Sequence, residues 1–270
     1  MIESEKAARI GDLLARFAMA SMLLLCSPAA SAAQAEPGAA PAVVELFTSQ
    51  GCDSCPPADR LIGELADRAD VVALTYNVDY WDYVGWPDTF ASAANTKRQK
   101  AYARAARRPD MYTPQIVING ERHVVGSDRA AVEAALDATR NDASGIAIEI
   151  RREDGRVTIQ LPESQVRREA TVWLVRFDRE RTQQIGRGEN AGRWLTYHNV
   201  VRDFWSLGLW LGSELRIVLD ESLLAQDDAD GCAILVQERS HGRILGAYLL
   251  KFAAPAEAPS PPAASAAPTP

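Results

Sequence analysis

Residues 43–59 have the sequence VVELFTSQGCDSCPPAD, and this stretch decides the fold of the first half of the chain. It begins with a short β-branched and apolar run, Val43–Phe47, which is typical of a buried strand. Apolar residues at helical spacing follow the two cysteines, and a second apolar run covers Val71–Tyr76. The pattern predicts a βαβ unit in which Cys52 and Cys55 lie between the first strand and the helix.

Cys52 and Cys55 form a C-x-x-C motif, which is typical of redox chemistry when it lies between a strand and a helix. In thiol–disulfide exchange, a thiolate attacks a disulfide sulfur and a neighbouring thiol resolves the mixed disulfide. The two intervening residues place the second thiol within reach of the first. We therefore expect Cys52 to attack and Cys55 to resolve.

The remainder of the first half predicts a helix, a β-hairpin and a final helix. A polar, alanine-rich stretch favours the first helix, the Asn119-Gly120 pair indicates a two-residue turn, and Asp128 can cap the last helix. The expected elements are a helix within Thr89–Arg107, strands Gln115–Ile118 and Arg122–Val125, and a helix over Arg129–Ala138.

From Gly145 onward the chain consists of short apolar runs with few helical signals, a pattern that favours an antiparallel β-sandwich. Glu153-Asp154-Gly155 indicates a turn between the first two runs, and the boundary between the two halves is expected near Asn141–Ser144. The expected strands are Ile146–Ile150, Arg156–Leu161, Thr171–Phe177, Leu195–Val201, Leu215–Leu219, Ala233–Gln237 and Ile244–Leu249.

Four segments together resemble a known family. They are residues 44–59, Tyr112-Thr113-Pro114-Gln115, Gly188-Glu189-Asn190 and Tyr197-His198-Asn199-Val200-Val201. The resemblance is to secreted bacterial proteins of unassigned function that combine a thioredoxin-like domain with a β-sandwich. It implies an α/β fold, with a thioredoxin-like domain over residues 36–141 and an antiparallel β-sandwich domain over residues 142–252. It implies no particular substrate.

The wider thioredoxin superfamily implies three site positions in this sequence. Cys52 would be the nucleophile, Cys55 the resolving thiol, and Pro114, preceded by Thr113, the proline that positions an extended substrate beside the motif. That proline is cis in thioredoxin-like folds, but only about 5–6% of X–Pro bonds in folded proteins are cis, so the sequence leaves the isomer open. We expect no organic cofactor and assign no metal ligand.

Two acidic residues near the motif have open roles. Thioredoxins carry a buried strand acid six residues before the first cysteine, whereas Glu45 lies seven residues before Cys52. Glu45 is either the proton acceptor for Cys55 or an exposed carboxylate at the sheet edge. The charge of Asp53 disfavours the Cys52 thiolate, whereas a helix N-terminus favours it, less so if Ser54 caps the helix. The net direction stays open.

Two loops are candidates for contact with the motif. Six of the 19 aromatic residues fall within residues 76–90, and Trp81 is the one that we assign to the site. These rings either floor a substrate groove or pack against the second half. The glycine-rich run 186–193 lacks the helix and the Lys-Ser/Thr pair of a phosphate loop. We expect it to pack against the first half, where it would cover the C-x-x-C motif.

The ends of the chain and its charge indicate an exported protein. Residues 1–35 combine basic residues, an apolar stretch and Ala33-Gln34-Ala35, which predicts a cleavable signal peptide and a periplasmic or secreted product. Residues 253–270 are almost entirely Ala, Pro and Ser, which predicts a disordered tail. The net charge of −7 argues against nucleic acid, and we expect no membrane contact after signal cleavage.

The leading hypothesis is an exported thiol–disulfide oxidoreductase that acts on protein or small-molecule disulfides and is regenerated by a redox partner. The alternative is a secreted binding or structural module in which Cys52–Cys55 is a permanent clip, and burial of both sulfurs would favour it. A copper or zinc carrier is the third hypothesis, because soft thiolates suit these metals. Cys232, in an apolar run, is expected to be a small buried side chain. The oligomeric state is left open.

Overall fold

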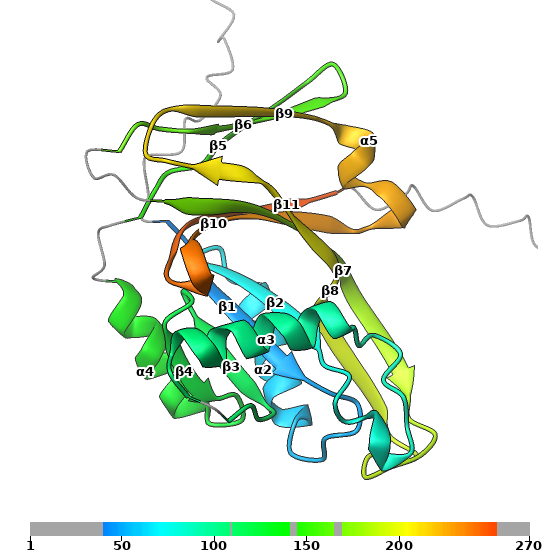
Figure 1. The fold of residues 1–270 in the computed structure, drawn as a ribbon. Coiled ribbons are helices and arrows are strands. Elements are labelled where there is room, and N and C mark those ends of the chain that lie inside the picture. Colours follow the sequence, from blue (N-terminus) through cyan, green and yellow to red (C-terminus); the bar gives the residue numbers. More distant parts are fainter. Residues whose placement is uncertain (1–39, 109, 141–144, 165–168, 253–270) are drawn as a thin grey trace, which may run out of the picture. The chain divides into compact units, whose positions relative to one another are not determined.

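The computed structural model describes residues 40–108, 110–140, 145–164 and 169–252. These residues belong to one compact unit, Ala39–Pro270. They form a mixed α/β structure with an eight-stranded mixed sheet, a three-stranded antiparallel sheet and four described α-helices (Figure 1). The expected signal peptide (1–35), the boundary near 141–144 and the Pro/Ala-rich tail (253–270) lie outside the described residues.

The first half of the chain forms the elements that its sequence predicts. They are β1 (Ala42–Thr48), α2 (Pro56–Ala66), β2 (Val71–Asn77), α3 (Ala93–Ala105), β3 (Gln115–Ile118), β4 (Arg122–Val125) and α4 (Arg129–Arg140). β1 and β2 are parallel, β3 is antiparallel to β1, and β4 is antiparallel to β3. In the hairpin turn, Asn119 and Gly120 have φ angles of 49° and 76°, as the Asn-Gly pair predicts.

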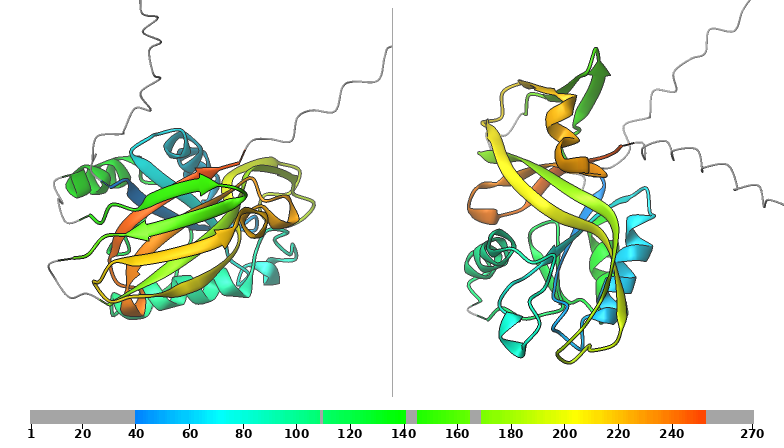
Figure 2. Two further views of the ribbon diagram at one scale, coloured as in Figure 1. Left: turned by 90° about the horizontal axis from the view of Figure 1, so that it is seen from above. Right: turned by 90° about the vertical axis from the view of Figure 1, so that its right-hand side faces the viewer.

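Side chains of β1 alternate between the two faces of the sheet. Val44 and Leu46 pack with buried residues of α2 and α4, whereas Val43 and Phe47 pack on the other face with Tyr102 of α3. Figure 2 shows α2 and α3 on opposite sides of the sheet. Because the C-x-x-C motif leads from β1 into α2, it belongs to the α2 side.

The second half contains the expected number of strands, divided between the two sheets. They are β5 (Glu149–Glu153), β6 (Arg156–Leu161), β7 (Ala170–Gln184), β8 (Trp194–Trp210), β9 (Leu215–Asp220), β10 (Gly231–Glu238) and β11 (Ile244–Lys251), with a short helix α5 (Glu221–Leu224). The small sheet has the order β5-β6-β9, and the large sheet has the order β11-β10-β7-β8-β2-β1-β3-β4. The parallel contact of Thr75 in β2 with Val200 in β8 makes one sheet from both halves.

β7 and β8 are much longer than the predicted runs Thr171–Phe177 and Leu195–Val201. The additional residues of β7, 178–184, pair with residues 194–200 of β8, and together they form a paired arm, residues 178–200, that extends past β2. The β7 part of this arm has the sequence DRERTQQ, so it lacks the apolar alternation by which a strand is recognised. Backbone pairing, as between Thr182 and Thr196, continues the ladder without that pattern.

A separate apolar core lies between the small sheet and the outer part of the large sheet. It includes Val157 and Ile159 of β6, Val172 and Leu174 of β7, and side chains of β10 and β11. The cysteine of β10, Cys232, is a buried free thiol in this core, and burial raises its pKa to about 12. None of the described helices is both long and apolar enough to cross a bilayer.

Candidate functional site

The structure places the C-x-x-C motif where the sequence predicts it, between β1 and α2, and joins Cys52 to Cys55 in a disulfide. Cys55 is the N-cap residue of α2 and makes no side-chain capping hydrogen bond. Ser54 therefore does not cap the helix, and its hydroxyl instead lies 3.4 Å from the Cys52 sulfur. Pro56 and Pro57 occupy the first turn, where a missing N–H costs little because no helical carbonyl would receive it.

The two cysteines are completely buried in a motif whose middle is exposed. Cys52 and Cys55 each have 0% of their surface accessible, whereas Asp53 and Ser54 face solvent. The disulfide is thus shielded from solvent, although the two residues between its cysteines are exposed. What covers it decides whether the pair can react.

Asn190, at the tip of the β7–β8 arm, contacts the motif directly. Its side-chain nitrogen donates to the carbonyl oxygens of Gln50 at 3.0 Å and Cys52 at 2.8 Å, and Asn190 is itself completely buried. Arg193 donates to the Asn190 side-chain oxygen at 2.7 Å, and the tip turns with positive φ at Gly188 and Gly192. The expected contact of the glycine-rich run 186–193 with the first half is present.

The aromatic loop 76–90 packs against the arm and also contacts the residues before the motif. Trp86 and Phe90 pack against a small cluster in the arm, made by Ile185, Leu195, Tyr197 and Val200. The indole N–H of Trp86 donates to the Gln50 side chain at 2.7 Å. Of the two interpretations of this loop, packing against the second half is therefore observed for Trp86 and Phe90.

Trp81 lies next to the motif. A Cβ atom added to Gly51 would be 3.3 Å from the Cβ atom of Trp81, so the tryptophan backbone runs beside the residue that precedes Cys52. Trp81 also stacks on Tyr83, whose side chain is 82% exposed. The structure thus brings this sequence-predicted residue to the site.

The Thr113-Pro114 bond is cis, and Pro114 lies close to the first turn of α2. A Cβ added to Gly126 would lie 3.1 Å from Ala58 of α2 and 3.2 Å from Pro114, so both residues border the same glycine. The Pro114 carbonyl accepts a hydrogen bond from the Gly126 N–H at 2.9 Å. The predicted proline and the predicted cysteines thus lie at the same end of β1.

Asp59 is a buried acid one helical turn after Cys55. Its backbone N–H donates to the Cys55 carbonyl at 3.1 Å, and this spacing puts the two side chains on one face of α2. One carboxyl oxygen accepts from the Thr48 hydroxyl at 2.8 Å, and the other has no partner among the described residues. Burial raises the pKa of Asp59 to about 8, with a smaller contribution from the charge of Asp88.

Asp59 is the residue that sequence reasoning missed, although a signal was present. It follows Cys55 by four residues and precedes the apolar Ile62 by three, a helical spacing that places it on the core face of α2. Tyr197 of the arm belongs to the same buried region. Burial raises the pKa of Tyr197, and the charges of Asp59 and Asp88 raise it further. Its hydroxyl has no hydrogen-bond partner among the described residues. The arm therefore reaches the buried acid as well as the disulfide.

Glu45 requires a correction. It is not an exposed edge carboxylate, because it is completely buried and lies 2.7 Å from the guanidinium of Arg98 in α3. Tyr102 of α3 also donates to it. β1 alternation places Glu45 on the α3 face, whereas Cys55 begins α2 on the other face, and the buried acid one turn after Cys55 on that helix is Asp59.

A known protein family matches the part of the chain that forms this site. The family model described as "Protein of unknown function (DUF1223)" matches residues 43–237, from β1 to β10. This chain belongs to the DUF1223 family. The match includes the motif, the aromatic loop, Pro114 and the arm, so the elements that meet at the disulfide all lie within the family's region.

Two solved structures resemble the DUF1223 chain. The X-ray crystal structure of protein AGR_C_4864 from Agrobacterium tumefaciens is 36% identical in sequence, with a TM-score of 0.70, and the match covers 80% of this chain and 96% of that one. HBP35 of Porphyromonas gingivalis has a TM-score of 0.55 at 13% identity, over 80% of this chain and 76% of that one, which shows a similarity of fold alone. No curated protein matches the chain.

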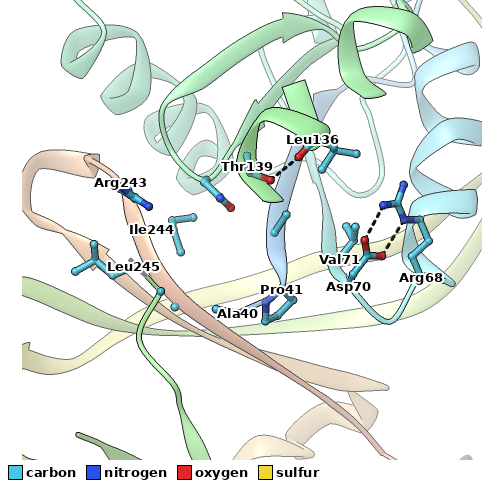
Figure 3. A pocket seen from close by; sticks show the side chains of 14 residues that line it. Ala40, Pro41, Arg68, Asp70, Val71, Leu136, Thr139, Arg243, Ile244 and Leu245 are labelled. Carbon is cyan, nitrogen blue, oxygen red and sulfur yellow. Dashed lines mark hydrogen bonds and ion pairs between the residues drawn. The ribbon is translucent and has the colours of Figure 1, made fainter. Parts of the chain in front are cut away.

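A hollow of about 120 Å³ lies at the opposite end of β1 from the cysteines (Figure 3). Ala40 and Pro41 line it together with Arg68, Asp70 and Ile244, and Arg68 already pairs with Asp70 at 2.8 Å. Gly145, another lining residue, follows directly on an undescribed segment, so we assign no ligand to this hollow. Among the residues that the structure describes, no group of three His, Cys, Asp or Glu side chains could hold a metal.

Proposed function

We propose that this DUF1223 protein is an exported thiol–disulfide oxidoreductase whose reacting pair is Cys52 and Cys55. The observation that carries the proposal is a C-x-x-C disulfide between a strand and a helix, with a buried carboxyl group of raised pKa, Asp59, one turn along the same helix. A permanent clip has no use for such an acid, whose burial destabilises the fold. A redox pair needs a group that can give and take a proton.

The proposal includes the fold implied by the resemblance. The strand order β2-β1-β3-β4, with α2 and α4 on one face and α3 on the other, supports a thioredoxin-like unit. The core between β5-β6-β9 and the strands β7, β10 and β11 supports a sandwich that follows it. Pro114, cis and near α2, is the position proposed to align an extended substrate beside the disulfide.

The reaction can be written from the oxidised state that the structure shows. A substrate thiolate attacks the Cys52 sulfur, the Cys52–Cys55 bond breaks, and Cys55 leaves as a thiolate that takes the proton of Asp59. A second substrate thiol attacks the substrate sulfur of the mixed disulfide, the bond to Cys52 breaks, and the proton of the attacking thiol passes to Cys52 as it leaves. The substrate dithiol is oxidised to a disulfide and the protein pair is reduced by two electrons. The reverse sequence reduces a substrate disulfide.

The arm must open for this chemistry. Cys52 is completely buried, and a substrate sulfur must approach it in line with the disulfide bond. The residues that close the site, Asn190 and Trp86, are joined to it by a few hydrogen bonds and a small apolar cluster separate from the main cores. Such peripheral clusters belong to the low-stability parts of proteins, which open without global unfolding.

Burial of both sulfurs also favours a second candidate function. In it, Cys52–Cys55 is a permanent clip that fastens the start of α2, and the protein is a secreted binding or structural module. The two candidates differ in the reduction potential of the pair. Structural disulfides have potentials below about −300 mV, whereas working pairs of this type lie between about −270 and −120 mV.

The deciding experiment is a redox titration of the mature protein against glutathione, with the state of Cys52 and Cys55 read by alkylation and mass. Cys232 stays unreactive under native conditions because its thiol is buried and its pKa is about 12. We expect a potential between about −270 and −120 mV. A pair that stays oxidised below about −300 mV would contradict the oxidoreductase and support the clip.

Asn190→Ala should make the disulfide easier to reduce. The change removes two buried hydrogen bonds to the motif, each worth about 1 kcal/mol, so the open arm gains population. The two bonds together are worth about 2 kcal/mol, so we expect reduction by dithiothreitol to be about 30-fold faster, since 1.4 kcal/mol is a factor of ten. The measurement is the rate at which alkylatable thiols appear.

A matched control for this variant lies in β8, the strand that follows the tip of the arm. Asn199 also donates through its side chain to a backbone oxygen, that of Ala73 at 2.8 Å, but it does not contact the motif. Asn199→Gly removes that bond and suits its φ of 46°. Equal reduction rates for wild type, Asn190→Ala and Asn199→Gly would show that the arm does not control access.

We propose the periplasm or the extracellular space as the place of action, from the predicted signal peptide and the oxidising chemistry there. A protein or small-molecule disulfide is the proposed substrate, and a redox partner would return the pair to its starting state. Nucleic acid is not a proposed partner, because the chain has a net charge of −7.

A further inference from the structure

One segment of this acidic protein is basic throughout. Residues 93–108, which include α3, contain six Lys and Arg residues and no Asp or Glu, whereas the whole chain has a net charge of −7. One of the six, Arg98, is buried in an ion pair with Glu45. The other five are exposed, and they are Lys97, Lys100, Arg104, Arg107 and Arg108.

Figure 1 labels the helix α3, and the exposed cations belong to this helix and to the residues directly after it. Lys97, Lys100 and Arg104 are spaced by three and four residues, which places them on a single helix face, and Arg107 and Arg108 follow directly on the end of the helix. We call these five residues the basic face. They border a shallow hollow of about 400 Å³ that is lined by Lys100, Ala103, Arg104, Arg107 and Arg108.

The basic face is not neutralised within the described part of the chain. Other surface arginines have carboxylate partners, for example Arg129 with Glu64 and Arg239 with Glu169, both at 2.6 Å. No ion pair joins any of the five basic-face residues to a described carboxylate. The negative end of the helix dipole accounts for cations in the last turn, such as Arg104, but not for Lys97 near the start of α3.

The basic face leads toward the candidate redox site. The chain continues from Arg108 to Tyr112, Thr113 and Pro114, the loop that we propose for substrate alignment. The Tyr112 carbonyl accepts a hydrogen bond from Gln99 of α3 at 2.8 Å. The charge of Arg108 adds to burial in lowering the pKa of His123, so its field reaches the β3–β4 hairpin as well.

We propose that the basic face docks an acidic segment of the protein that exchanges disulfides with Cys52. This inference rests on the proposed function and adds to it a class of partner, one that carries clustered Asp or Glu residues near its reacting cysteine. Three of the five cations are arginines, whose planar guanidinium groups bind carboxylates by two parallel hydrogen bonds. An unpaired basic surface on an acidic protein also steers an acidic partner into one orientation while the remaining surface repels it.

The test uses two short peptides that each contain one disulfide, flanked by glutamates in one and by glutamines in the other. The rate constant for their reaction with the reduced full-length mature protein is measured at low and at high salt. We expect the glutamate peptide to react about tenfold faster at low salt, and this preference to shrink as salt screens the charges. The triple variant K100Q/R104Q/R107Q should lose most of the preference.

A matched variant, R122Q/R156Q/R216Q, removes the same charge from exposed positions on β4, β6 and β9. It should keep the preference. If both triple variants lose it equally, or if wild type does not distinguish the peptides, the basic face is not a docking surface for acidic protein segments.

Binding without reaction separates the two proposals. Versions of both peptides with serine in place of cysteine are titrated into the oxidised protein, so no disulfide exchange takes part. Selective binding of the glutamate version, lost in K100Q/R104Q/R107Q, supports the docking surface. If this binding is observed but neither disulfide peptide reacts, the oxidoreductase proposal fails and the docking surface stands. Binding to phosphatidylglycerol vesicles without binding to the glutamate peptide would overturn the proposal in favour of a lipid surface.

Discussion

The free energy of unfolding of the wild-type protein should fall as the pH rises because of Asp59, and Asp59→Asn should abolish this contribution. Burial raises the pKa of Asp59 from 3.8 to about 8 in the folded protein. Between these values the unfolded chain has released the proton while the folded protein still holds it, so the unfolded state binds fewer protons and stability falls with rising pH. The span corresponds to about 6 kcal/mol, since one pKa unit is 1.36 kcal/mol.

The measurement is the free energy of urea unfolding of the oxidised protein at several values between about pH 4 and pH 8. The difference between wild type and Asp59→Asn isolates this carboxyl from the other titrating groups. We expect the variant to gain on wild type steadily across this range and to be the more stable protein near pH 8. Asp67→Asn, an exposed change just after the same helix, is the control. Parallel curves for wild type and Asp59→Asn would contradict the prediction.

The same variant should slow disulfide exchange, because asparagine cannot donate a proton to Cys55 as it leaves. A positioned general acid contributes about 100-fold or more to such steps. We expect a loss of this size at pH 7 with an unchanged dependence on dithiol concentration. A variant that gains stability near pH 8 and exchanges at the wild-type rate would place Asp59 in the fold but outside the chemistry.

Glu45→Gln should cost about 3–5 kcal/mol of stability, because it leaves the Arg98 charge buried without its partner. Both side chains are completely buried, and the Arg98 guanidinium is enclosed by four aromatic rings with centres 5.2–5.8 Å away. The rings belong to Tyr76, Tyr102, Trp173 and Phe204. Since Trp173 and Phe204 lie on β7 and β8, the pair joins the two halves of the chain, and we expect the loss to affect global unfolding.

Urea unfolding of the wild type and of three variants measures this effect. The double variant Glu45→Leu with Arg98→Met removes both charges, so we expect it to be more stable than Glu45→Gln. Glu64→Gln breaks the exposed pair with Arg129 and should have a much smaller effect. If Glu45→Gln behaves like Glu64→Gln, the buried ion pair does not hold the two halves together.

The elements of the first half could be predicted from sequence because each has a local cause. The apolar runs of β1 and β2 and the Asn119-Gly120 turn specify structure over a few residues, and β3, β4 and β6 have the predicted bounds. The position of the C-x-x-C motif follows from the order of these elements. The extension of β7 over residues 178–184 was not predicted, since its polar residues carry no periodic signal and are held by pairing with β8.

The amino-acid sequence by itself determined the βαβ unit, the place of Cys52 and Cys55 within it, and the number of strands that follow. These depend on periodicity and turn chemistry, which act between near neighbours. Only the tertiary structure decided that Asn190 donates to the Cys52 carbonyl, that Glu45 pairs with Arg98 and that Asp59 is buried one helical turn after Cys55. Burial and pKa depend on which distant residues exclude water from a side chain, and no local pattern encodes that.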